Sequence, residues 1–109
     1  MHELGITQNI VAIVGERAGD QKVSRVKLEI GKLSAIEPEA IRFCFDLCAK
    51  GTGIEGAVLE IDEIEGRGKC NLCGEEMTLT LLAGTCSCGC RDITCLAGQE
   101  LKIKEMEVE

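Results

Sequence analysis

Cysteines gather in one segment of this chain, at spacings that are typical of a metal site. Six of the eight cysteines lie between residues 66 and 97, and Cys70 and Cys73 form a C-x2-C pair followed by Gly74. In such a knuckle the backbone N–H groups point at the thiolates, and glycine permits the close backbone approach. Four thiolates arranged as a tetrahedron form the closed coordination of a structural zinc ion. We therefore expect this segment to bind Zn(II).

The second pair of zinc ligands has three candidates, Cys86, Cys88 and Cys90, which follow the first knuckle after twelve intervening residues. Any two of the three can complete a four-sulfur site. We favour Cys86 with Cys88, because Gly89 then has the position that Gly74 has in the first knuckle. Unligated thiols or a disulfide are the alternative to metal binding. A thioredoxin-like redox role fits poorly, because that motif opens a helix and this one follows a strand into a hairpin.

The single histidine of the chain, His2, stands beside the first amino group. One interpretation is an ordinary residue on a loose chain end. The other is coordination, because a free amine at Met1, the backbone nitrogen of His2 and its imidazole can close fused chelate rings around one ion. The backbone nitrogen or the carboxylate of Glu3 can then complete a square. Ni(II) and Cu(II) favour this planar geometry, and zinc does not.

Composition excludes several classes of function. The formal charge is −7, from 19 acidic and 12 basic side chains, which disfavours binding to nucleic acid. The chain shows no export signal and no apolar segment of the length that a membrane span needs. We therefore expect a cytoplasmic protein with no membrane or nucleic-acid partner. In that reducing compartment, clustered cysteines bind metal or do redox work more often than they form disulfides.

Two amphipathic helices are predicted from apolar spacing. The first runs from Leu4 to about Ala18, and Gly19 with Asp20 ends it. The second follows Pro38, a residue suited to the first turn of a helix, and ends at Gly51. The apolar positions are Ile6, Ile10, Ile13 and Val14 in the first helix and Ile41, Cys44, Phe45 and Cys48 in the second. Their spacing makes Cys44 and Cys48 small buried hydrophobic residues rather than ligands.

Three strands are predicted from alternation of apolar and polar residues. The apolar positions are Val26, Leu28 and Ile30 in the first strand, Leu59 and Ile61 in the second, and Leu101 and Ile103 in the third. In the third strand the pattern shifts phase at Met106 and Val108, as a β-bulge would produce. The cysteine-rich excursion between the second and third strands has too few apolar residues to build its own core.

At nearly full length the chain resembles the nickel metallochaperones of hydrogenase maturation, also called the hydrogenase nickel-incorporation proteins. The resemblance rests on "MHE", "VKLEIGKLSAIEPEAIRFCFDL", "GTGIEGAVLEI", "CNLCG" and "GQELKIKEMEVE". It implies an α+β fold of two lobes, in which two helices pack on a three-stranded sheet and a four-cysteine zinc-binding lobe is inserted. The nickel-binding domain is expected at 1–66, completed by a final strand at 98–109, and the zinc-binding domain at 67–97.

The resemblance also implies the ligands of each metal. It assigns nickel to Met1, His2 and Glu3, and zinc to Cys70, Cys73 and Cys88. The family pattern ends in C-P-x-C-G where this chain has "CSCG", one residue shorter. The fourth zinc ligand is therefore Cys86, which we favour, with Cys90 as its substitute. Cys95 has no place in the family pattern.

Family members are carriers, so we expect no enzyme activity. The resemblance implies that a partner GTPase takes part in passing transported nickel to the large subunit of a nickel–iron hydrogenase, with urease maturation proteins as further candidate partners. The chain itself is expected to be a monomer or a weak homodimer. The alternatives are a zinc-ribbon protein-interaction module in which His2 has no role, and an iron–sulfur or rubredoxin-like electron carrier that uses the same four sulfurs.

Overall fold

The computed structural model describes residues 2–109, with side chains from residue 3 onward. The chain divides into two compact units. One consists of Met1–Leu28, Ile36–Asp62 and Lys102–Glu109, and the other of Glu29–Ala35 and Glu63–Leu101. Two three-stranded sheets are present, with strand orders β2-β1-β6 and β4-β3-β5. None of the described helices combines the length and the apolar character that crossing a membrane requires.

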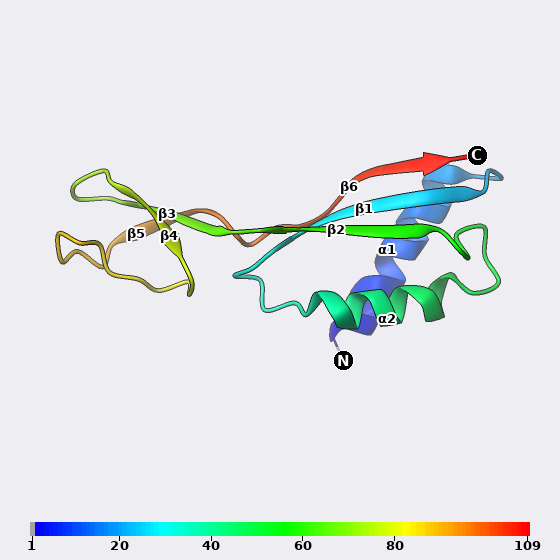
Figure 1. The fold of residues 1–109 in the computed structure, drawn as a ribbon, viewed down its shortest axis with the longest axis horizontal. Helices are drawn as coiled ribbons and strands as arrows, with labels where there is room; N and C mark the ends of the chain where they lie inside the picture. The colour runs from blue at the N-terminus through cyan, green and yellow to red at the C-terminus, as the bar shows by residue number, and fades with distance from the viewer. Residues whose placement is uncertain (1) are drawn as a thin grey trace. The chain divides into compact units, whose positions relative to one another are not determined.

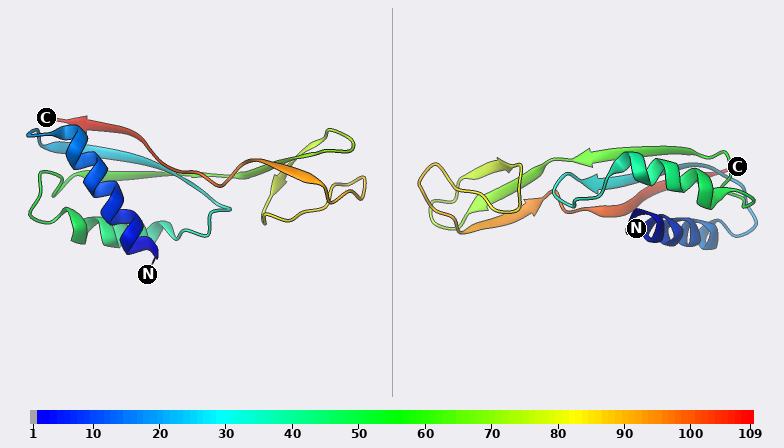
Figure 2. Two further views of the ribbon diagram at one scale, coloured as in Figure 1. Left: turned by 180° about the vertical axis from the view of Figure 1, so that it is seen from behind. Right: turned by 90° about the horizontal axis from the view of Figure 1, so that it is seen from below.

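The first unit is built from both helices and one sheet. Figures 1 and 2 show the two helices on the same face of the sheet. The elements are α1 (His2–Ala18), β1 (Val23–Gly31), α2 (Pro38–Ala49), β2 (Val58–Ile64) and β6 (Leu101–Val108). Because β1 is the central strand, β2 and β6 are the two edges. This arrangement of helices on a sheet confirms the expected α+β class.

Local sequence explains where α2 begins and ends. Pro38 opens the first turn, where its missing N–H costs nothing, and the carboxylate of Glu37 accepts a hydrogen bond from the backbone N–H of Glu39 at 3.3 Å. After the helix, Gly51 takes a φ of 78°, which an L side chain rarely adopts. The predicted start and stop signals of this helix are therefore confirmed.

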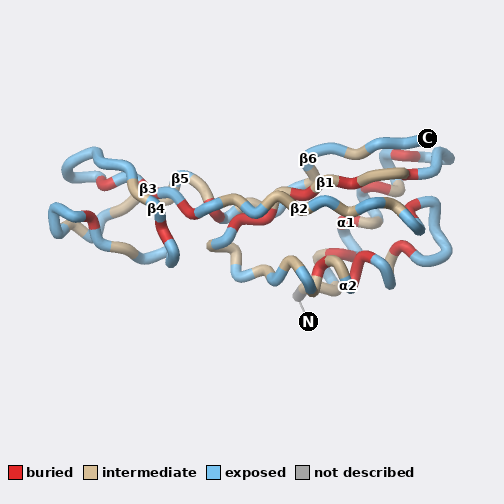
Figure 3. Tube along the Cα trace, viewed as in Figure 1, coloured by how far each residue is buried: buried red, intermediate tan, exposed pale blue. Residues whose placement is uncertain are grey.

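The apolar core of the first unit lies between the helices and the inner face of β1. Figure 3 shows buried positions alternating along β1 and following one side of α2. Fully buried side chains include Val14, Val26, Leu28, Ile41, Phe45 and Ile54. Two expectations from the sequence were wrong in degree. Ile13 is 44% exposed, because it lines a groove beside β6, and Cys48 is half-buried where Cys44 is buried.

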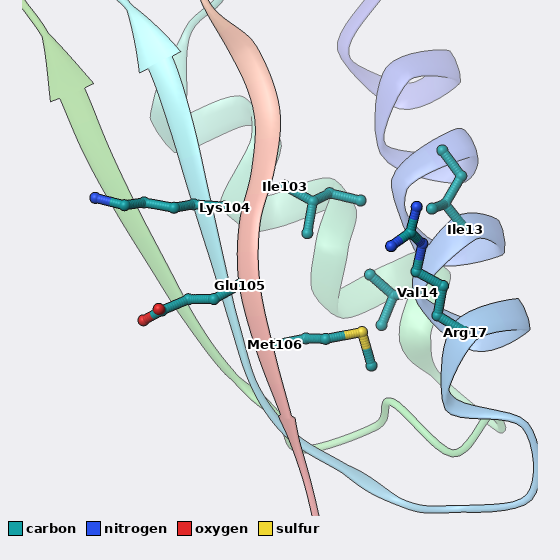
Figure 4. Close-up of a pocket in the computed structure, with 7 residues that line it drawn as sticks. All are labelled: Ile13, Val14, Arg17, Ile103, Lys104, Glu105 and Met106. Carbon is teal, nitrogen blue, oxygen red and sulfur yellow. The ribbon is translucent and has the colours of Figure 1, made fainter.

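The last strand changes the side to which its side chains point, as the sequence predicted. Figure 4 shows Ile103 and Met106 directed toward α1, whereas the intervening Lys104 and Glu105 both point away from it. Two consecutive residues on one side interrupt strict alternation, which is the effect of an extra residue in a strand. The phase shift lets two apolar side chains three residues apart face the same helix.

The outer face of this sheet carries charges that join its three strands. Arg25 on β1 forms ion pairs with Glu105 and Glu107 on β6, each at 2.8 Å, and with Glu60 on β2. The hydrogen bond from Arg25 lowers the pKa of Glu105 below its ordinary value. One guanidinium therefore bridges the central strand to both edges, and the sequence pattern alone did not predict it.

The second unit contains the sheet of β3 (Gly66–Cys70), β4 (Glu76–Leu79) and β5 (Ile93–Ala97), in which β3 pairs antiparallel with both neighbours. Gly66 is required here, because a Cβ at that position would collide with the carbonyl oxygen of Leu79. The large aliphatic side chains that the described part of this unit buries are Ile30 and Leu79. The sequence predicted that the first knuckle follows a strand into a hairpin, and it did not predict the three strands of this sheet.

Candidate metal site

Four sulfur atoms of the second unit come together at the ends of two loops. The Sγ atoms of Cys70, Cys73, Cys86 and Cys88 all lie within 4.8 Å of one another. The Cys70–Cys88 separation is 3.7 Å and the Cys73–Cys86 separation is 3.5 Å. A tetrahedron with Zn–S bonds of about 2.3 Å has S···S edges of about 3.8 Å. The spacing therefore fits one tetrahedral metal ion.

The first loop positions Cys70 and Cys73 through a tight turn after β3. The backbone N–H of Gly74 donates to the carbonyl of Cys70 at 2.9 Å, and Gly74 has a φ of 79°. The N–H of Cys73 points toward the Cys70 sulfur at 3.5 Å. This N–H is the main cause that lowers the pKa of Cys70, to about 6. The turn thus stabilises the thiolate that a metal requires.

The second loop repeats this design with Cys86 and Cys88. The N–H of Gly89 donates to the carbonyl of Cys86 at 2.8 Å, and Gly89 has a φ of 92°. The two glycines that the sequence singled out thus both take the left-handed conformation. The shorter C-x-C spacing also lets the N–H of Cys86 donate to the carbonyl of Cys90 at 2.8 Å, which closes the loop.

The other two cysteines of the segment point their sulfurs elsewhere. The Cys90 sulfur accepts a hydrogen bond from the backbone N–H of Asp92 at 3.3 Å. The Cys95 thiol donates to the carbonyl of Ala97 at 3.4 Å. Neither residue belongs to the four-sulfur group. Of the three pairs that the sequence left open, the structure brings Cys86 and Cys88 together with the first knuckle.

Electrostatics favours a bound cation at this group. The N–H of Cys90 lowers the pKa of Cys88, but the Cys86 thiol, burial and the other two thiols outweigh it and raise the pKa to about 12. Four sulfurs this close repel one another when all are ionised, so protons remain on some of them without a cation. A divalent ion removes this repulsion and displaces those protons. The donor set fits zinc, for which four thiolates are one of the typical structural sites.

Polar side chains outside the sulfur group join the first loop to the start of β5, and the sequence pattern did not indicate them. The side-chain amide of Asn71 donates to the carboxylate of Asp92 at 3.0 Å, and the hydroxyl of Thr94 donates to the Asn71 amide oxygen at 2.9 Å. Asn71 stands between the first two cysteines, which is the only sequence signal of this role. These contacts hold the first loop against the segment that enters β5.

The predicted nickel ligands lie at the start of α1. Met1 is outside the described residues, and so is the side chain of His2, although the backbone of His2 forms the first residue of α1. Glu3 is half-buried in the first turn, and its carbonyl accepts a hydrogen bond from the Thr7 hydroxyl at 2.6 Å. Backbone N–H groups of a first turn have no intrahelical acceptor. The nitrogens of His2 and Glu3 are thus not used by the helix.

Comparisons with known proteins give one consistent result over the full length. A family model described as "Hydrogenase/urease nickel incorporation, metallochaperone, hypA" matches residues 1–108. The hydrogenase maturation factor HypA of Nostoc sp. (strain PCC 7120) is 62% identical over 109 residues, which cover 100% of this chain and 96% of that protein. The hydrogenase maturation factor HypA of Geobacter metallireducens is 44% identical over 110 residues, with 100% of each chain covered.

Solved structures match the fold. The solution structure of the Ni metallochaperone HypA from Helicobacter pylori matches with a TM-score of 0.69 and 21% identity, and it covers 97% of this chain and 96% of that one. A second solution structure, of a HypA protein, matches with a TM-score of 0.70 and 22% identity, over 100% of this chain and 97% of that one. The same arrangement of elements is thus present in both.

Proposed function

The chain belongs to the HypA family of hydrogenase/urease nickel-incorporation metallochaperones, and from that premise we propose that it binds one Ni(II) ion at Met1, His2 and Glu3 and delivers it for the maturation of nickel–iron hydrogenase. The four-cysteine group binds Zn(II) in a structural role. The observation that carries this proposal is the start of α1 at His2, which leaves two backbone nitrogens of the first turn without helical partners.

Nickel is held by nitrogen atoms that the start of the chain supplies within a few bonds of each other. The amine of Met1, the backbone nitrogen of His2 and its imidazole form fused chelate rings, and Glu3 supplies the fourth donor through its backbone nitrogen or carboxylate. Such a planar set suits Ni(II) and discriminates against zinc. Tetrahedral thiolates at the other site have the opposite preference. The two donor sets therefore sort the two metals.

This arrangement carries a metal and does not catalyse a reaction. A zinc ion enclosed by Cys70, Cys73, Cys86 and Cys88 has no open position for water or substrate. A planar ion at a chain end is accessible from above and below its plane, so an incoming ligand attaches before the old ones leave. Handover then requires only ligand exchange, with the partner GTPase and the hydrogenase large subunit as the receiving machinery. Both partners are consistent with the cytoplasmic location that the sequence favours.

A nickel titration at several pH values tests the proposal. One equivalent of Ni(II) should bind wild-type protein, and its affinity should fall steeply from about pH 8 to about pH 6, because protons compete at an amine with a pKa near 7.7 and an imidazole near 6.5. His2→Ala should abolish this binding and keep its zinc content. Equal nickel affinity in wild type and His2→Ala would contradict the proposed site, and wild-type protein that binds no stoichiometric nickel would support the alternative, a zinc-ribbon interaction module without nickel function.

A further inference from the structure

A groove of about 290 Å³ lies between α1 and the edge strand β6. Figure 4 shows its apolar walls, with Ile13 and Val14 on the helix and Ile103 and Met106 on the strand. Val14 is fully buried and forms the floor, whereas Ile13 is 44% exposed, although its position in the apolar pattern predicted burial. The groove therefore exposes apolar surface that the core of the unit does not use.

One cation lies over this apolar surface. In Figure 4 the guanidinium of Arg17 reaches into the groove between Ile13 and Ile103. Arg17 forms no ion pair with any residue in the part of the chain that the structure describes. Glu105 lines the groove only with its backbone. Its carboxylate points away from α1 and accepts a hydrogen bond from the Arg25 guanidinium at 2.8 Å. A guanidinium fork beside apolar walls is complementary to a carboxylate that is attached to an apolar group.

Size and position favour a protein segment over a small molecule. The volume is at the lower limit of the range of about 300–1,000 Å³ that is typical of small-molecule sites, and it is enough for one large side chain. The groove also runs along an edge strand, where an extended segment finds unpaired backbone groups. A second copy of this chain is disfavoured, because two molecules with a net charge of −7 repel each other.

We propose that this groove binds an extended segment of a partner protein in which a large apolar residue stands next to an aspartate or glutamate. The apolar side chain packs between Ile103, Met106 and Ile13, and the carboxylate accepts a bidentate hydrogen bond from Arg17. The choice of partners to test rests on the proposed function, which supplies the maturation GTPase and the hydrogenase large subunit.

The charge contact is tested by affinity measurements with purified GTPase and purified large subunit. Arg17→Glu should weaken binding of at least one of them about tenfold or more, because a hydrogen bond to a charged group contributes roughly that factor. Lys50→Glu is the matched control, since Lys50 is exposed on the same unit and the substitution makes the same change in net charge. It should change the affinity less than about threefold, the effect of general electrostatics alone.

The apolar contact is tested with Ile13→Ser, against Leu47→Ser as a control of similar exposure on α2. Ile13→Ser should weaken the same partner and Leu47→Ser should not, while nickel and zinc contents stay at wild-type values in all four variants. Binding that is unchanged by both groove variants, or weakened equally by the controls, overturns the inference and leaves the nickel function intact. Wild-type protein that binds neither partner contradicts both the inference and the partners in the proposed function.

Discussion

Removal of the metal from the four-cysteine group should unfold the second unit and leave the first one folded. The first unit has a core of its own, in which Leu28, Ile41 and Phe45 are at most 2% exposed. The described part of the second unit buries only Ile30 and Leu79 as large aliphatic side chains. Its three short strands therefore depend on another source of stability.

The magnitudes favour the proposed metal as that source. Burial of one aliphatic side chain contributes about 1.5–3 kcal/mol, so two contribute no more than about 6 kcal/mol. A structural zinc ion on four cysteines contributes about 10–16 kcal/mol at neutral pH. Without the metal, protons return to sulfurs such as Cys88, whose pKa is raised to about 12 by its neighbours. The lost stabilisation then exceeds what the small apolar core supplies.

Amide spectra of labelled protein before and after chelation measure this directly. Signals from β3, β4, β5 and the turns at Gly74 and Gly89 should move to the positions of an unfolded chain once a coloured chelator shows that one equivalent of metal has been released. Signals from α1 and α2 should remain dispersed. Dispersed signals for Gly74 and Gly89 after verified release would refute the reasoning, because the unit would then be stable without its metal.

Three further expectations follow. Cys88→Ser should lose one equivalent of bound metal and Cys90→Ser should keep it, as metal analysis will show, because the Cys90 sulfur already accepts a backbone hydrogen bond. The ion pair that lowers the pKa of Glu105 stabilises the fold at pH values above 4.5, the ordinary pKa of this carboxyl, and this stabilisation is lost as the pH falls through the lowered pKa. Thermal melts of wild type and Glu105→Gln should therefore differ at neutral pH and converge in strong acid. Phe45→Ala should lower the free energy of unfolding in urea by about 3–5 kcal/mol, whereas Phe43→Ala, at a site that is 68% exposed, should lower it by less than about 0.5 kcal/mol. Equal losses in the two variants would contradict the assignment of Phe45 to the core.

Periodicity was sufficient to predict the elements of the first unit. Alternation at Val26, Leu28 and Ile30 marked the inner face of β1, and Pro38 with Gly51 marked the ends of α2, because these signals depend on neighbouring residues only. The exposure of Ile13 could not be predicted in this way. Its spacing fits the apolar stripe, and only the position of β6 leaves a groove beside it.

The metal-binding turns of the cysteine-rich segment were predictable from the sequence, and the pairing of its strands was not. The C-x2-C-G and C-x-C-G spacings indicated two facing turns, and the left-handed Gly74 and Gly89 are the physical reason. Pairing of β5 with β3 depends on contacts between residues far apart in sequence, so a local pattern gives no signal of it. The hydrogen bond between Asn71 and Asp92 was missed for the same reason.

The central claim is that nickel is held by the start of the chain, and one change tests it most directly. Placing Gly-Ser ahead of Met1 keeps every side chain, including His2, and converts the amine that closes the chelate rings into an amide. The visible d–d band of planar Ni(II) and the one-to-one stoichiometry should then disappear, as they should in His2→Ala, while the zinc content and the fold stay unchanged. An extended protein that binds nickel with the native band and affinity would contradict the account.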